Sequence, residues 1–280
     1  FRAKDITQVE LETISESLPS FNWQTVYDRQ ISLSSSEEKQ IRESISNGVN
    51  AKLRSYQLEG VRWLAAMRIN HHGCLLADEM GLGKTLQVLS HLYALGKTDM
   101  PHLVIAPTSL VYNWQSEIKK FIPSWENRIG VQLHSPDKTK QLLIVSYDIL
   151  RLNIDKYKQI EYDTIIIDEA QIIKNRETQK YKAIKTLKSL HHIILTGTPI
   201  ENSIDDIWSH FMILMPGMKT LYTSLNKRCQ SKTDESFLEL SRKFLKPFIL
   251  RRTKLEVLKD LPKLIEKTVY VEMSSAERHL

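Results

Sequence analysis

The sequence predicts an α/β protein built on a mostly parallel, doubly wound sheet. From residue 51 onward, short apolar runs alternate with amphipathic helical stretches, which is the rhythm of βαβ units. These runs are apolar throughout rather than alternately apolar and polar, as expected for strands that are covered by helices on both faces. Motifs rich in glycine, acidic or hydroxyl residues follow several runs, and open sheets of this kind bind ligands beyond the carboxyl ends of their strands.

The apolar runs define five expected strands, at residues 73–77, 102–107, 141–146, 163–168 and 192–196. The run KTVYVEM (267–273) predicts one more strand near the end of the sequence. The segment from about 217 to 262 is basic and mostly helical in pattern, so we expect a helical protrusion there. Residues 1–50 are expected to be the end of an N-terminal extension. They include SSSEEKQIRESIS, which has a serine cap and places Ile41 and Ile45 on one helical face.

Composition narrows the class of protein. The 280 residues can bury a full core, and 41% hydrophobic with 26% charged residues is ordinary for a globular protein. No apolar run approaches the ~18 residues of a membrane span, so no membrane partner is expected. Cys74 and Cys229 form neither a disulfide framework nor a metal-binding spacing, which fits a reducing compartment.

Charge is distributed unevenly along the chain. Residues 171–280 hold 20 Lys or Arg against 12 Asp or Glu, whereas residues 1–50 hold 5 against 8. A basic third of the chain indicates a polyanionic partner such as nucleic acid. A lysine-rich solvated surface is the alternative that charge alone leaves open.

The stretch CLLADEMGLGKTLQVLSHL (74–92) predicts a phosphate-binding loop between a strand and a helix. Gly81 and Gly83 permit backbone angles that turn successive N–H groups around an anion. Lys84 can reach the β- and γ-phosphates, and the Thr85 hydroxyl can hold Mg²⁺. The usual pattern has glycine where Asp78 stands, and we expect that position only to open the loop. The alternative is an ordinary turn before a helix.

The stretch DTIIIDEAQ (163–171) predicts the second half of a hydrolytic site. Asp168 ends a β-rich run, where a carboxylate can hold Mg²⁺. The neighbouring Glu169 can orient and polarise an attacking water. An acidic pair is weak evidence alone because such pairs are common at helix N-termini. With the glycine loop upstream, the pair indicates a site that hydrolyses a nucleotide triphosphate.

These motifs resemble those of the Snf2 family of superfamily-2 helicase-like ATPases. DEMGLGKT, DEAQ and LTGTPIEN carry the resemblance, together with LRSYQLEGVRWL (53–64), LVIAPTSLVYNWQSEIKKF (103–121), IVSYDIL (144–150) and FILRRTKLEVLKDLPK (248–263). The blocks occur in family order over about residues 51–280. The resemblance implies that this region is the first RecA-like lobe of a P-loop NTPase, with the helical protrusion inside it.

The resemblance assigns the catalytic and nucleotide-binding roles to individual residues. Gln57 would read the adenine edge, with Arg54 and Tyr56 beside it. The loop would contribute Gly81, Leu82, Gly83, Lys84 and Thr85 to phosphate binding. Lys84, Asp168 and Glu169 would be catalytic, and Thr85 and Asp168 would hold Mg²⁺.

The resemblance also implies a DNA-facing surface and a coupling motif. The loops that touch the DNA backbone would hold Pro107, Thr108, Ser109, Ser146 and Tyr147. Small hydroxyl residues and backbone N–H groups at strand ends suit phosphate contacts, which position a protein without reading sequence. The residues that couple the nucleotide state to DNA binding would be Gln171, Thr196, Gly197 and Thr198. Gln171 stands where many relatives have His. Trp114, in contrast, is expected to pack in a core.

For the complete protein, the resemblance implies a DNA-stimulated ATPase that translocates on double-stranded DNA and remodels protein–DNA complexes. A second RecA-like lobe, expected beyond residue 280, would be a partner in the same protein and would supply arginine fingers. DNA-bound proteins would be further partners, and the nucleoid or the nucleus the compartment. Arg251 and Arg252 are expected in the helical protrusion rather than as fingers. The fragment alone is expected to hydrolyse little ATP.

Three alternatives remain at this point. A strand-separating DNA or RNA helicase would share the same lobe. A small P-loop kinase would need an acceptor pocket and a lid, and LTGTPIEN (195–202) argues against it. A non-catalytic DNA-binding module would not need Lys84, Asp168 and Glu169.

Overall fold

A seven-stranded, all-parallel sheet organises the molecule. The computed structural model describes residues 33–197, 204–215, 217–228 and 235–257. The strand order is β3-β4-β2-β5-β6-β1-β7, and every neighbouring pair is parallel. The strands are β1 (Cys74–Leu76), β2 (His102–Ala106), β3 (Ile129–Gln132), β4 (Leu142–Ser146), β5 (Glu161–Ile167), β6 (Lys188–Leu195) and β7 (Ile249–Leu250).

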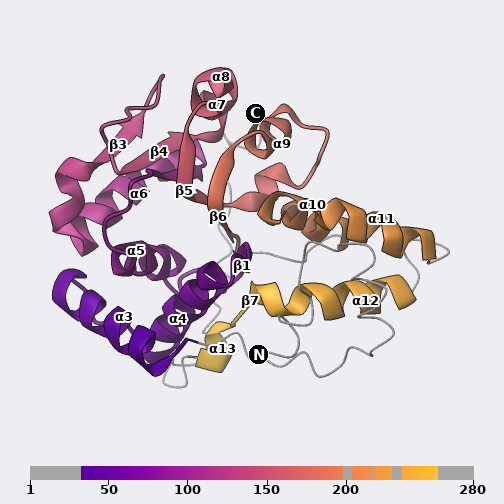
Figure 1. The fold of residues 1–280 in the computed structure, drawn as a ribbon, viewed down its shortest axis with the longest axis horizontal. Helices are drawn as coiled ribbons and strands as arrows, with labels where there is room; N and C mark the ends of the chain where they lie inside the picture. The colour runs from indigo at the N-terminus through magenta and orange to yellow at the C-terminus, as the bar shows by residue number, and fades with distance from the viewer. Residues whose placement is uncertain (1–32, 198–203, 216, 229–234, 258–280) are drawn as a thin grey trace, which may run out of the picture.

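Helices surround this sheet (Figure 1). The α-helices are α3 (Ser35–Gly48), α4 (Ser55–Ile69), α5 (Lys84–Ala94), α6 (Thr108–Phe121), α7 (Tyr147–Leu152), α8 (Ile154–Tyr157), α9 (Gln179–Lys185), α10 (Ile204–Leu214), α11 (Met218–Arg228), α12 (Glu235–Leu245) and α13 (Lys254–Val257). Short 3₁₀ turns are η1 (Pro123–Arg128), η2 (Ala170–Ile173) and η3 (Lys246–Phe248). Figure 1 shows α3, α4 and α5 grouped on one side of the molecule and α10, α11 and α12 on the other.

The five strands expected from apolar runs are confirmed as β1, β2, β4, β5 and β6. All residues of β1, β2 and β4 are buried, as continuous apolar runs predict for strands covered on both faces. The parallel, doubly wound α/β fold class is therefore confirmed. The expected strand at 267–273 lies outside the described residues.

Two strands were missed, and one of them corrects the predicted protrusion. The edge strand β3 contains Gly130 and is only four residues long, so it has no clear apolar run. Residues 217–262 were expected to be helical, and α11 and α12 are. The chain then returns to the sheet as β7, which pairs with β1 through Leu75↔Ile249 and Leu76↔Leu250. A strand of two residues is too short to show a periodicity of its own.

The helix predicted within residues 1–50 is confirmed as α3. Ser34 caps it: its Oγ accepts a hydrogen bond from the Glu37 backbone N–H at 3.3 Å, and the Ser34 N–H donates to the Glu37 carboxylate at 2.7 Å. This is a capping box. Ile41 and Ile45 are buried in a small cluster with residues of α4, so α3 packs against α4. The proposed boundary at residue 50 stays a prediction.

An ion pair holds α4 against β5. The Arg68 guanidinium donates to Asp163 at 2.7 Å and to the Thr164 hydroxyl at 3.1 Å. Burial raises the pKa of Asp163. Hydrogen bonds from His102 and Thr164 and the charges of His102 and Arg68 outweigh that effect, so the pKa lies well below its usual range. The ion pair with Arg68 of α4 therefore helps to keep the buried Asp163 carboxylate ionised.

Among the described residues, no helix combines the length and the apolar character that a membrane crossing would require.

We predict that Arg68→Met lowers the free energy of unfolding by about 3 kcal/mol, because it leaves the Asp163 charge buried with fewer partners. Arg62→Met on the same helix is the matched control: Arg62 pairs with Glu38, and both side chains are about one-third exposed. Its loss should cost under about 1 kcal/mol. Urea titration of the three proteins measures both values, and equal losses would contradict the assigned role of burial.

Candidate nucleotide site

The predicted phosphate loop connects β1 to α5 and has the backbone shape that the glycines suggest. Gly81 and Gly83 have φ values of 90° and 79°, in the left-handed region that favours glycine. Gly83 is the N-cap of α5, and no side chain caps this helix in the described part of the chain. The first backbone N–H groups of α5 are thus left for another acceptor, as at anion-binding helix N-termini.

Lys84, the first residue of α5, faces the predicted catalytic groups. Its Nζ donates a hydrogen bond to the Asp78 carbonyl at 2.7 Å, which closes the loop on itself. Burial lowers the pKa of Lys84, while the nearby carboxylates of Glu169, Asp168 and Asp78 act in the opposite direction. The ammonium group is therefore held between the loop and the acidic pair.

Asp168 follows β5 directly, and three neighbours fix it. The indole N–H of Trp114 donates to Oδ2 at 2.8 Å, and the backbone N–H of Glu169 donates to Oδ1 at 2.9 Å. The Tyr147 hydroxyl donates to the Asp168 carbonyl at 2.6 Å. Burial raises the pKa of Asp168; the Trp114 hydrogen bond opposes this, and the Glu169 charge adds to it. The carboxylate is oriented but only partly neutralised, which suits an incoming cation.

The residues present fit Mg²⁺ that arrives with a nucleotide. Within the described ranges, no group of three or more His, Cys, Asp or Glu could hold a metal ion by itself. Mg²⁺ usually needs only one or two protein carboxylates, because waters and substrate phosphates complete its shell. Asp168 would supply the carboxylate. The predicted second ligand, Thr85, hydrogen-bonds with the Glu117 carboxylate through its side chain.

Glu169 connects the acidic pair to the coupling motif. It has a φ of 49°, an uncommon value for a residue with a side chain. The Gln171 amide donates to its carboxylate at 2.7 Å, and the Thr196 hydroxyl donates to the Gln171 carbonyl oxygen at 3.3 Å. A Cβ added at Gly197 would lie 3.9 Å from the Lys84 Nζ. The structure thus brings Gln171, Thr196 and Gly197 to the loop, and Thr198 lies outside the described residues.

The predicted adenine reader lies against the phosphate loop. Gln57 is buried at the start of α4; its amide donates to the Leu82 carbonyl at 3.2 Å and its oxygen accepts from the Arg54 N–H at 2.9 Å. Tyr56 is buried, whereas Arg54 is exposed. The Leu82 side chain is fully buried, so only its backbone can face a phosphate. The adenine-reading role of Gln57 stays a prediction.

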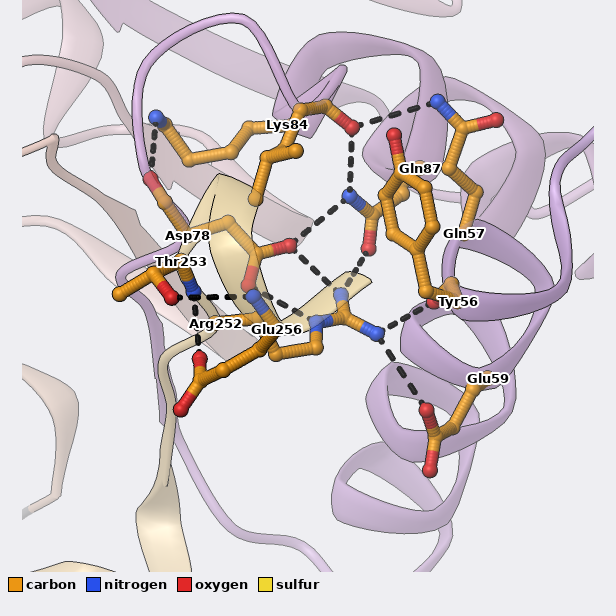
Figure 2. A network of polar contacts seen from close by, with 10 residues as sticks. Tyr56, Gln57, Glu59, Asp78, Lys84, Gln87, Arg252, Thr253 and Glu256 are labelled. Carbon is orange, nitrogen blue, oxygen red and sulfur yellow. Dashed lines mark hydrogen bonds and ion pairs between the residues drawn. The ribbon is translucent and has the colours of Figure 1, made fainter. Parts of the chain in front are cut away.

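One part of the site was missed by sequence reasoning. Asp78 was expected only to open the loop, but its carboxylate is fully buried and bonded to Arg252 at 2.9 and 2.6 Å and to Gln87 at 3.1 Å (Figure 2). Arg252 was expected in a helical protrusion; instead it is the second residue after β7 and lies beside the loop. The short apolar run FIL (248–250) just before this arginine was the available signal.

The predicted DNA-facing residues follow two neighbouring strands. Pro107 is the N-cap of α6, and the Thr108 and Ser109 side chains are exposed in its first turn. Ser146 is buried and caps α7 by accepting from the Ile149 N–H at 3.2 Å. The Tyr147 side chain is buried, with its hydroxyl engaged by Asp168. At these last two positions, the predicted DNA contact can involve the backbone but not these occupied side chains.

Comparison with known proteins places the chain in a family. The SNF2-related domain matches residues 56–280. An uncharacterized ATP-dependent helicase of Mycoplasma genitalium is 40% identical over 263 residues, covering 89% of this chain and 25% of that protein. The TATA-binding protein-associated factor mot1 of Schizosaccharomyces pombe is 35% identical over 274 residues, covering 85% of this chain and 14% of that protein. The chain thus spans a quarter or less of these relatives.

A solved structure gives the same result. The SWI2/SNF2 ATPase core of Sulfolobus solfataricus, in complex with dsDNA, superposes with a TM-score of 0.70 at 37% identity, covering 83% of this chain and 51% of that one. The parallel α/β fold described above is therefore that of a known ATPase core. The chain belongs to the SNF2-related domain family, as the N-terminal RecA-like lobe of a Snf2-type ATPase.

Proposed function

We propose that this lobe binds Mg²⁺–ATP at the 78–85 loop and supplies the hydrolytic half of a DNA-stimulated motor. The observation that carries the proposal is the placement of Lys84, after β1, and of Asp168 and Glu169, after β5, at the same edge of the parallel sheet. Three of the parts that phosphoryl transfer needs are a phosphate cradle, a metal-holding carboxylate and a water-orienting group. All three have a candidate in this arrangement.

Each residue has a specific task in this proposal. The α5 N-terminus and Lys84 bind the phosphates, and release of Lys84 from the Asp78 carbonyl frees its ammonium group to do so. Trp114 and the Glu169 N–H orient the Asp168 carboxylate. Glu169 holds the attacking water and Gln171 holds Glu169. Mg²⁺ would neutralise charge on the phosphates when bound.

We further propose that the complete protein translocates on double-stranded DNA, with a second RecA-like lobe closing over the nucleotide, and remodels protein–DNA complexes. The DNA complex of the Sulfolobus relative supports DNA as the polyanion. Closure would act through differential contacts in the nucleotide-bound and free states. Because one relative is named a helicase, a strand-displacement assay should accompany these tests, and unwinding of a duplex would favour the helicase alternative.

Lys84→Ala in the full-length protein should reduce DNA-stimulated ATP turnover by about 100-fold or more, because it removes the cation that faces the phosphates. Lys97→Ala is the control, since Lys97 is exposed just beyond the other end of α5. Phosphate release measures both. Turnover that Lys84→Ala leaves unchanged would refute the assignment of the loop.

Trp114→Phe should keep the packing but remove the hydrogen bond to the Asp168 carboxylate. Loss of a bond to a charged group costs enough to raise the Mg²⁺ concentration for half-maximal turnover by about 10-fold. The pKa of Asp168 should rise, so the acid limb of the pH–rate profile should move to higher pH. Trp125→Phe, at another buried tryptophan, is the control. Identical Mg²⁺ and pH dependence in both variants would argue against this role for the indole N–H.

Ser109→Glu should weaken DNA binding without unfolding the protein. An acidic residue in the first turn of α6 is compatible with the helix dipole, but it would repel DNA phosphates. We expect a loss of about 10-fold or more at low salt, and a wild-type affinity that itself falls steeply as salt rises. Ser36→Glu, in the first turn of α3, is the matched control. Fluorescence anisotropy with duplex DNA measures both, and a flat salt response would count against backbone binding.

A further inference from the structure

The Asp78 carboxylate is a buried charge that depends on one cation. Its side chain is fully buried, and it accepts hydrogen bonds from the Arg252 Nε at 2.9 Å, from the second Arg252 nitrogen at 2.6 Å and from Gln87 at 3.1 Å. The Arg252 side chain is itself only 10% exposed. A buried carboxylate without a partner is costly, so Asp78 is held where the guanidinium can reach it.

Four of the five N–H groups of Arg252 donate hydrogen bonds in this network. Besides Asp78, it donates to the Tyr56 carbonyl and to the Gln87 amide oxygen at 2.8 Å, and it pairs with Glu59 at 3.6 Å. Figure 2 shows the guanidinium lying between α4 and the loop, with these groups arranged around it. The planar guanidinium group of arginine suits this arrangement of acceptors, because a lysine ammonium cannot donate in so many fixed directions.

The backbone around Arg252 is joined to the beginning of the loop. We call residues 250–254 the strap. The Ala77 N–H donates to the Leu250 carbonyl at 2.7 Å, and the Glu79 N–H donates to the Arg252 carbonyl at 2.9 Å. The Glu79 carboxylate in turn accepts from the Lys254 N–H at 2.7 Å. Residues on both sides of Asp78 are thus fixed to the strap.

Asp78 transmits this restraint to the groups proposed to bind phosphate. Its carbonyl accepts the Lys84 Nζ hydrogen bond at 2.7 Å. Gln87, held by both Asp78 and Arg252, also donates to the Leu82 carbonyl at 3.4 Å. Moving Asp78 would therefore move the start of the loop, the anchor of Lys84 and the Leu82 peptide.

We propose that Arg252 is a positioning residue for the phosphate loop: through Asp78 and the strap it holds the loop in the shape that receives the nucleotide phosphates. Arg252 would not touch the nucleotide. This inference rests on the proposed function of the loop. In this proposal, Asp78 structurally replaces the glycine of the usual pattern. The shape of the loop is then set by an ion pair between two residues that are 174 positions apart in the sequence.

The test uses Arg252→Gln in the full-length protein, with Arg251→Gln as the matched control, because Arg251 is the exposed neighbour. Hydrogen exchange without nucleotide should accelerate about 10-fold in peptides covering 77–87, while β2 and β5 stay protected. The dissociation constant for Mg²⁺–ATP, measured at low temperature by competition with a fluorescent analogue, should rise by about 10-fold. Arg251→Gln should leave both unchanged.

Several results would overturn the inference. One is loop exchange in Arg252→Gln equal to wild type. Another is faster exchange throughout the protein with an unchanged affinity for Mg²⁺–ATP, which would make Arg252 a general stabilising residue. If Arg252→Gln does not fold, Arg252→Lys replaces it in the test, because lysine keeps the positive charge but lacks the planar set of N–H donors. It should show faster exchange confined to 77–87, and wild-type exchange there would equally refute the idea.

Failure of the proposed function would look different. Lys84→Ala would then bind Mg²⁺–ATP as tightly as wild type, or neither protein would bind it. The exchange measurement on the nucleotide-free protein would still decide whether Arg252 holds the loop.

Discussion

Parallel pairing of β5, β6, β1 and β7 is the constraint on which the site depends. In a parallel sheet all carboxyl ends lie at one edge, so whatever follows each of these strands is brought together there. The acidic pair follows β5, Thr196 follows β6, the loop follows β1 and Arg252 follows β7. The sequence separates these groups widely, and hydrogen bonding between strands puts them within reach of one another.

The site concentrates charges that would be unfavourable singly. Asp78 and Asp168 are buried carboxylates, and Lys84 is a partly buried ammonium. Asp78 is matched by a guanidinium and an amide, which satisfies it within the protein. Within the described part of the chain, Asp168 is bonded to an indole and a backbone N–H but to no buried cation, and burial raises its pKa. In the proposals made above, this difference separates a carboxylate that maintains the shape of the loop from one that is available to a metal ion.

Much of the fold and site could be predicted from local sequence. Five apolar runs predicted five strands, and the glycines at 81 and 83 have the backbone angles that the loop required. Trp114 was expected in a core and is there, but its N–H bond to Asp168 could not be foreseen, because it joins residues 54 positions apart. The Arg252–Asp78 ion pair was missed for the same reason. It depends on β7, a two-residue strand whose existence is decided by pairing with β1 rather than by its own sequence.

The hydrogen bonds also suggest how the lobe could report its nucleotide state. Glu169 is bonded to Gln171, and Gln171 to Thr196, which directly follows β6. A Cβ added at the next residue, Gly197, would lie 3.9 Å from the Lys84 Nζ. The Gln171 hydrogen bond uses one oxygen of the Glu169 carboxylate, so the other oxygen can orient a water while Gln171 stays bonded, and a movement of Glu169 carries Gln171 with it. A movement of the Glu169 side chain would therefore also affect Thr196, because the side-chain amide of Gln171 is hydrogen-bonded to both residues. Coupling of this kind needs two discrete arrangements of the same hydrogen-bonding groups rather than a continuous deformation of the sheet.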